Sequence, residues 1–189
     1  EDVQRSGVFT MAPKSFYPLN APQQERDLRT PSPPQAPCGG LCLSDWAGAP
    51  VNADYLGFGY LGEQGGRLVA FGNFFNTRLD QPSSARVFTK IYTGELSADG
   101  ARKIAHEYAA DILAQFGVPS LVGSKIYFVS DRQGKGTKEI WVMDFDGSNQ
   151  RRLTHFNSIS TMPSVSPDGR RLAFTTYAKG QPQIMMYST

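Results

Sequence analysis

The six residues KIYFVS at 125–130 recur as RLAFTT at 171–176, and this repeat decides the fold of the second part of the chain. Each copy is followed by a second matching segment, EIWVM at 139–143 and QIMMY at 183–187. The first pair of segments is offset by 46 positions and the second pair by 44, which fits a shorter hairpin loop in the later copy. A period of about 44 residues with four short strands per unit is typical of β-propeller blades.

Turn residues separate the repeated segments. In the motif before the second copy, proline presets φ, aspartate bonds to nearby backbone and glycine accepts a positive φ. This repeat turn motif consists of Ser166, Pro167, Asp168 and Gly169. Asp146-Gly147 closes another hairpin in the same way. Two aligned repeats with matching turns predict all-β propeller blades over residues 120–189, about one and a half blades in this chain.

Three strand-like segments lie upstream of the repeats, at 54–61, 67–75 and 85–93. The sequence EQGG at 63–66 separates the first two and is a hairpin signal. We expect an antiparallel meander with one packed face.

One long helix is expected between this meander and the repeats. Ser97 is a suitable N-cap, and Gly117 with Pro119 ends the pattern. The apolar stripe at helical spacing comprises Ala101, Ile104, Ala105, Tyr108, Ile112, Leu113 and Phe116. The helix is expected to pack on the meander, giving an α/β domain over residues 1–119. His106 follows Ala105 and is expected in solvent or at the rim of the helix.

A proline-rich stretch interrupts this domain at residues 18–50, with seven prolines. Proline lacks the amide donor and fixes φ, so we expect neither a helix nor a central strand here. Within the stretch, the short apolar segment at 45–47 (DWA) is expected to anchor the loop to the domain.

Cys38 and Cys42 are the two cysteines of the chain. A structural zinc site needs four ligands, and the remaining candidates, His106 and His155, fall in other elements. The pair is therefore either a short-loop disulfide or two free thiols.

No other motif predicts a cofactor site, a metal site or catalysis. The acidic segment DFDGSN at 144–149 begins like a calcium loop, but position 155, its twelfth, is histidine rather than glutamate. The glycine-rich segment at 131–136 lacks the strand, Gly-Lys-Ser/Thr and helix of a phosphate loop, which predicts a flexible loop instead. No nucleophile motif with a paired acid is visible, so the sequence predicts a protein that is not an enzyme.

Composition excludes several classes of protein. Of 189 residues, 40% are hydrophobic, which is enough for a packed core. A net charge of +2 gives no electrostatic footprint for nucleic acid, and no run of eighteen apolar residues could span a bilayer. The chain opens at Glu1 without a leader, so we expect its start to be missing.

The two regions together resemble the TolB family, the periplasmic subunit of the Tol-Pal system. The second region resembles its propeller repeats, and residues 1–117 are similar to the small α/β domain before them. DVQRSGVF at 2–9 matches the Asp-x-x-x-Ser-Gly-x-Phe end of that family's first helix. The matching repeat positions are 125–129, 139–144, Gly147, 151–154, 163–169 and 172–174.

The resemblance implies a non-enzymatic periplasmic scaffold that binds Pal and other Tol proteins and supports outer-membrane integrity and cell division. Compared with the family, the chain lacks the N-terminal tail that engages TolA, the first strand and most of the first helix. The family has six blades, so Ile184 to Tyr187 should be covered by a longer product or by another molecule, which includes self-association through an open propeller edge. The alternative is the regulatory propeller of a prolyl-oligopeptidase-like serine peptidase, whose propellers share such repeats.

Overall fold

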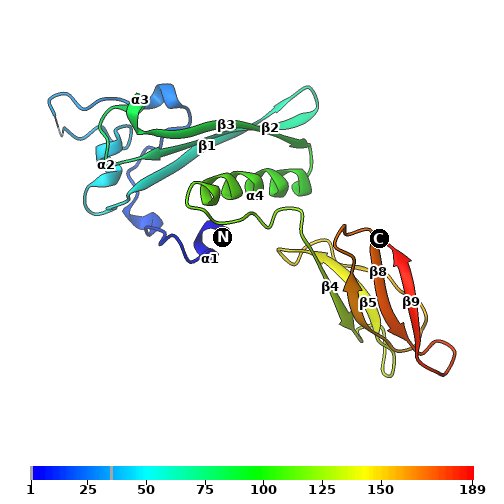
Figure 1. Cartoon of the computed structure of the whole chain (residues 1–189). Coiled ribbons are helices and arrows are strands. Elements are labelled where there is room, and N and C mark those ends of the chain that lie inside the picture. Colours follow the sequence, from blue (N-terminus) through cyan, green and yellow to red (C-terminus); the bar gives the residue numbers. More distant parts are fainter. Residues whose placement is uncertain (1, 35) are drawn as a thin grey trace. The chain divides into compact units, whose positions relative to one another are not determined.

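Two units, Glu1–Ser120 and Leu121–Thr189, make up the chain, here called the first and the second unit. The computed structural model describes residues 2–34 and 36–189 (Figure 1). Glu1, at the predicted helix end, and Gln35, in the proline-rich stretch, lie outside the described residues. Most of the regular structure is β-sheet, arranged as three separate three-stranded antiparallel sheets.

The sheet of the first unit is the predicted meander. Its strands β1 (Tyr55–Gln64), β2 (Arg67–Asn76) and β3 (Arg86–Glu95) pair in the order β1-β2-β3. Gly65 and Gly66 form the β1–β2 turn with φ of +59° and +75°, which suits a two-residue hairpin loop. A short helix, α3 (Pro82–Ala85), connects β2 to β3. The three strand predictions are confirmed.

Helix α4 (Ala98–Ala114) runs along one face of this sheet (Figure 1). The Ser97 Oγ accepts a hydrogen bond from the Gly100 amide at 3.0 Å, which confirms the predicted N-cap. The predicted stripe is wrong at two positions, because Ala105 is exposed and Phe116 lies beyond the end of α4 and is 37% exposed, while Ala109 is buried instead. Alanine is small enough to sit on either side of a helix, so it marks the buried face poorly.

Glycines let the helix approach the sheet closely. A Cβ on Gly72 would lie 2.8 Å from the ring of Tyr108, so only glycine leaves room for this tyrosine. The Tyr108 hydroxyl donates to the Asn73 carbonyl at 2.5 Å, and burial raises the pKa of Tyr108 above its usual value. Tyr108 therefore fixes the distance between α4 and β2.

The first helix, α1 (Asp2–Arg5), packs against α4. The His106 Nδ1 and the Asp2 carboxylate are within hydrogen-bonding distance, and the His106 side chain is only 16% exposed. Of the two predicted places for His106, solvent is wrong, and its half-buried position agrees with the rim of the helix. Its partner is 104 residues away in sequence, so spacing along the helix gave no sign of it.

The proline-rich stretch covers the other face of the sheet. Two short helical elements lie within the stretch, η2 (Glu25–Asp27) and α2 (Leu43–Ala47). A third, η1 (Lys14–Phe16), lies just before it. The expectation of no helix at 18–50 is wrong at α2 and η2, because the prolines flank these segments rather than interrupt them.

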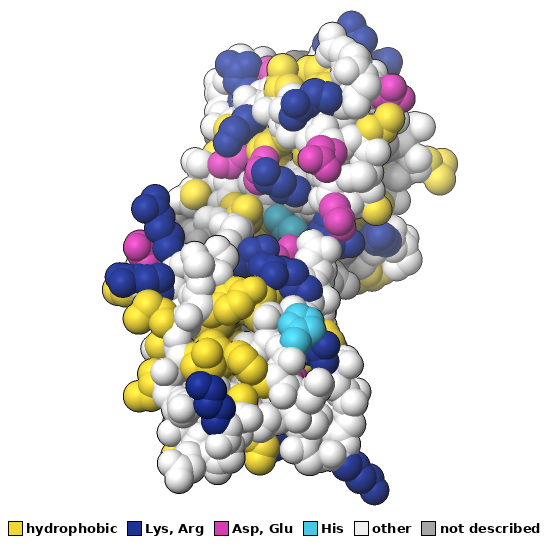
Figure 2. Space-filling model, turned by 90° about the vertical axis from the view of Figure 1, so that its right-hand side faces the viewer, with side chains coloured by type: hydrophobic (Ala, Val, Ile, Leu, Met, Phe, Trp, Pro, Cys, Tyr) yellow, Lys and Arg dark blue, Asp and Glu magenta, His cyan; other side chains and the backbone are white. Residues whose placement is uncertain are grey.

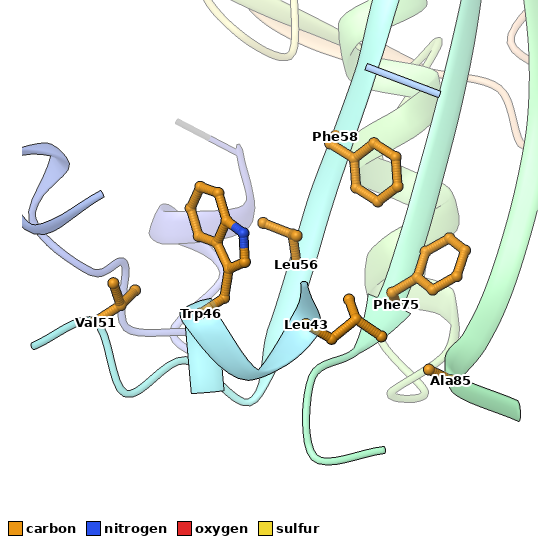
Figure 3. Close-up of a cluster of buried hydrophobic side chains, with 7 residues drawn as sticks. All are labelled: Leu43, Trp46, Val51, Leu56, Phe58, Phe75 and Ala85. Atoms are coloured by element: carbon orange, nitrogen blue, oxygen red, sulfur yellow. The ribbon is translucent and has the colours of Figure 1, made fainter. Parts of the chain in front are cut away.

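Helix α2 brings Trp46 into a buried hydrophobic cluster with strand residues (Figure 3). Leu56 and Phe58 alternate with Gly57, whose missing Cβ faces Tyr108 of α4, so the cluster lies on the sheet face away from that helix. The cluster comprises Leu43, Trp46, Val51, Leu56, Phe58, Phe75 and Ala85. The predicted anchor around Trp46 is confirmed.

The second unit holds two antiparallel sheets. The first contains β4 (Lys125–Ser130), β5 (Glu139–Asp144) and β6 (Arg151–Arg152). The second contains β7 (Ser160–Val165), β8 (Arg171–Thr176) and β9 (Gln183–Ser188). The four repeated segments are strands, as predicted.

Each of these sheets has three strands, where the sequence predicts four per unit. The repeat aligns β8 with β4 and β9 with β5. Strand β7 therefore precedes the shared pair, and β6 follows it. The two sheets show different sets of three out of the four predicted strand positions.

The core of the second unit lies between its two sheets. Ile140, Val142 and Leu153 from the first sheet cluster with Leu172 and Phe174 of β8. All five are at most 5% exposed. Over the part of the chain that the structure describes, no helix has the length and apolar character needed to cross a bilayer.

Candidate interaction surfaces

A disulfide joins Cys38 and Cys42 within the proline-rich stretch at 18–50, with their Cα atoms 5.4 Å apart. Cys42 is buried and Cys38 is half-buried. Both sulfur atoms lie near the Asp45 carboxylate, a donor set that could hold a metal ion. The disulfide removes the two thiolates that such a site needs, so this set does not fit a zinc ion.

The Asp45 carboxylate organises the disulfide loop. It accepts hydrogen bonds from the backbone amides of Cys38, Gly40 and Cys42, the shortest being 2.7 Å to Gly40. The Trp46 Nε1 donates to the Gly40 carbonyl at 2.9 Å. Sequence reasoning missed this role of Asp45, although an acidic residue three positions after a helix N-cap is a recognisable signal.

The disulfide loop is also tied to the start of the proline-rich stretch. The Asn20 amide and side chain both donate to the Gly39 carbonyl, at 3.3 and 3.1 Å. Gly40 has φ of +103°, and a Cβ there would lie 1.9 Å from the Asn20 carbonyl oxygen. Only glycine permits this close approach. The loop, Asp45 and Trp46 thus form one hydrogen-bonded unit that holds the cover on the sheet.

Replacing both Cys38 and Cys42 with serine is expected to lower the free energy of unfolding of the first unit by roughly 2 kcal/mol, the loop-closure term for so short a loop. Urea denaturation with and without a thiol reductant measures this change. The reductant should destabilise the wild-type chain and leave the double variant unaffected. Equal denaturation curves for all four samples would show that the disulfide contributes nothing to stability.

The repeat turn motif connects β7 to β8. The Gly169 amide donates to the Ser166 carbonyl at 2.8 Å, and Gly169 has φ of +71°. The Asp168 carboxylate accepts from the Ser166 hydroxyl and the Arg170 amide, and these bonds lower the pKa of Asp168. These contacts are those of a turn. The motif lies at the end of the sheet, between β7 and β8.

The acidic segment at 144–149 is a hairpin turn between β5 and β6. The Asp146 carboxylate accepts from the Ser148 amide and hydroxyl, at 2.9 and 2.6 Å. The Asp144 carboxylate pairs with the Lys125 ammonium, which holds the pKa of Asp144 below its usual value. The expectation of a polar turn rather than a calcium loop agrees with these contacts.

The loop at 131–136 is anchored through Arg132. Its guanidinium lies 4.4 Å from the Trp141 ring centroid and 5.6 Å from that of Phe128, and it donates to Gln150 at 2.8 Å. The expectation of a flexible loop did not include these contacts. Nothing in the local sequence pairs Arg132 with Trp141, because β-sheet pairing brings them together.

Exposed apolar side chains gather on the second unit, in the lower part of Figure 2. Strand β9 is exposed along its whole length, with Ile184 84% and Met186 66% exposed. The unit also carries nine Lys and Arg against five Asp and Glu, a formal charge of +4. The second unit thus has exposed apolar side chains and a positive formal charge, and exposed apolar patches are typical of sites for another macromolecule.

No protein-family model matches the sequence. A "Protein TolB homolog" of Chlorobium luteolum is 38% identical over 135 residues, which are 71% of this chain and 29% of that protein. A homolog of the same name from Chlorobaculum tepidum is 36% identical over 147 residues, 77% of this chain and 31% of that protein.

A "Tol-Pal system protein TolB" of Cereibacter sphaeroides is 33% identical over 149 residues, 77% of this chain and 32% of that protein. The crystal structure of TolB from Acinetobacter baumannii shares the fold with a TM-score of 0.66 at 16% identity, covering 94% of this chain and 49% of that one. The chain spans about a third of the length of these sequence relatives. On this sequence similarity, together with the shared fold, the chain belongs to the TolB family of the Tol-Pal system.

Proposed function

We propose that the chain is part of a non-enzymatic, periplasmic scaffold of the Tol-Pal system, which binds Pal and other Tol proteins. Through these partners it supports outer-membrane integrity and cell division. The single observation that carries the proposal is the similarity to TolB proteins over both units of the chain. The TolB names of these relatives favour the scaffold over the serine-peptidase alternative.

The two units take different parts in this proposal. The first unit corresponds to the N-terminal α/β domain of a TolB-type protein, with the disulfide-bearing cover as an added feature. The second unit corresponds to β-propeller repeats. Two facts support the repeats: β4 and β5 recur as β8 and β9, and the sheets pack face to face around one core.

We place the binding of Pal on the second unit. Its exposed apolar side chains provide area to bury, and its positive charge favours a partner with acidic groups. The hydrogen bonds of its turns, such as that between Gly169 and Ser166, hold this surface in one conformation before binding.

Capture of purified Pal from the same organism by the immobilised chain tests the proposal. We expect Pal to be retained, and retention to weaken as salt is raised, because the second unit is positively charged. The matched control is the same chain unfolded in urea before it is immobilised. This unfolded sample is expected to retain no Pal. Folded chain that retains no Pal at low salt would contradict the proposed function.

A further inference from the structure

Apolar side chains stand in solvent beside the disulfide loop of the first unit. They belong to the segment FYPL at 16–19, where Leu19 is fully exposed and Phe16 and Tyr17 are 45% and 38% exposed. Single exposed apolar residues are ordinary on a protein surface, but three within four positions concentrate apolar area at one place. We call Phe16, Tyr17 and Leu19 the loop cluster.

The folded chain holds the loop cluster in this exposed position. The Tyr17 amide donates to the Lys14 carbonyl at 3.1 Å, and the Tyr17 ring packs edge-on against Trp46, with 5.3 Å between the ring centroids. Next to Leu19, Asn20 is hydrogen-bonded to the disulfide loop. The loop cluster is therefore ordered before it meets a partner, so binding costs little conformational entropy.

Positive charge accompanies the loop cluster, although the net charge of the whole chain is only +2. Residues 3–24 and 28–44 contain no aspartate or glutamate, and their basic residues are Arg5, Lys14 and Arg29. Lys14 begins the helical turn η1, which ends at the first residue of the cluster. The Arg29 amide donates to the Leu41 carbonyl at 2.8 Å, so Arg29 lies beside the disulfide loop as the cluster does.

The acidic residues between these two segments already have partners. Glu25 forms an ion pair with Arg86 at 3.0 Å. The Asp27 carboxylate accepts hydrogen bonds from two backbone amides, which lower its pKa. Lys14 and Arg29 are exposed, and neither pairs with a carboxylate among the described residues. The folded chain therefore leaves the positive charge near the loop cluster unneutralised.

We infer that the loop cluster docks on the surface of a bilayer that contains anionic phospholipids. Leu19 and Phe16 enter the boundary of the acyl chains, and Tyr17 lies at the level of the headgroups, because its ring is apolar and its hydroxyl is polar. Lys14 and Arg29 bind the lipid phosphates. A bilayer suits this loop because it accepts a protruding apolar side chain without needing a pocket of matching shape.

Sedimentation of the 189-residue chain with vesicles tests the inference. The two probes are vesicles of phosphatidylcholine alone and vesicles of phosphatidylcholine with phosphatidylglycerol. We expect the chain to sediment with the anionic vesicles, to bind the neutral ones more weakly, and to be released as salt is raised. Hydrogen exchange at saturating anionic vesicles should slow at residues 14–20.

Two variants separate the apolar and the charged contributions. Leu19→Asp should weaken binding to anionic vesicles roughly tenfold or more, because a carboxylate replaces the inserted side chain and repels the lipid phosphates. Lys14→Gln should weaken it roughly fivefold. The matched controls are Leu61→Asp, 53% exposed on β1, and Lys179→Gln, exposed in the second unit, and both should bind like the wild type.

Urea denaturation verifies that each variant is folded, which is expected because Leu19 and Lys14 are exposed. A folded wild-type chain that ignores anionic vesicles, or a Leu19→Asp variant that binds them like the wild type, would overturn the inference. Loss of Pal capture in Leu19→Asp with unchanged vesicle binding would identify the loop cluster as a protein site instead. The inference does not depend on the proposed function, since vesicle binding is measured without Pal and either result can fail alone.

Discussion

Replacing Trp46 with alanine is expected to lower the free energy of unfolding of the first unit by about 3–5 kcal/mol, the usual range for a large aromatic residue in a core. Trp46 is 3% exposed and lies among Leu43, Val51 and Leu56 in the cluster beneath the proline-rich cover. Its loss leaves a cavity there. It also removes the donor that binds the Gly40 carbonyl, so the disulfide loop keeps only its hydrogen bonds to Asp45 and Asn20.

Residue-resolved hydrogen exchange measures this effect, because opening of β1 and β2 is reported by their own amides. Trp46→Phe is the matched control: it keeps most of the apolar volume and loses the hydrogen bond, so its cost should be clearly smaller. If Trp46→Ala left the exchange of β1 and β2 unchanged, the proline-rich stretch would not be part of the core of the first unit.

Replacing Leu172 with alanine is expected to destabilise the second unit by about 2–5 kcal/mol. Leu172 is fully buried, and it belongs to the only cluster that joins the two sheets among the described buried clusters. Its removal therefore weakens the contact between the sheets rather than either sheet alone. Urea denaturation followed by Trp141 fluorescence and by exchange of the β5 and β8 amides measures the loss.

The matched control for this variant is Leu121→Ala. Leu121 is in the same unit and is exposed, so the change should stay within about 0.5 kcal/mol of the wild type. Equal stability of the Leu172 and Leu121 variants would mean that the two sheets fold without their shared core.

The strands of the chain follow from its sequence because their signals are local. Each repeated segment is a short run of apolar residues bounded by polar residues, and Gly65-Gly66 or Ser166 to Gly169 supplies the turn chemistry that the backbone requires. The number of strands per sheet was harder to predict. Strand β6 has two residues, Arg151 and Arg152, and no apolar pattern marks so short a segment.

Contacts between distant residues account for most of the errors. His106 is held by Asp2, and Arg132 lies over Trp141, and neither pair can be read from spacing along one element. Ala105 was assigned to the buried stripe on helical spacing alone, whereas the close packing of Tyr108 on Gly72 sets which side of α4 faces the sheet.

The proline-rich stretch at 18–50, which covers the first sheet, holds one feature that the sequence predicts and one that it does not. Its anchor at Trp46 could be predicted, because an isolated aromatic residue in a polar loop is stabilised by burial. The disulfide loop that holds Trp46 could not be predicted. The Asp45 carboxylate accepts hydrogen bonds from three backbone amides, and Gly40 packs against Asn20, only in the folded chain. Sequence alone left the state of Cys38 and Cys42 open, and the structure pairs them.

The central claim is that the chain is a Tol-Pal scaffold whose second unit binds Pal. Hydrogen exchange of the chain with and without purified Pal from the same organism tests it most directly, because the measurement reports binding and its location together. We predict slower exchange in the second unit, between Lys125 and Ser188, when Pal is added at saturation. Unchanged exchange throughout a folded chain would contradict the claim.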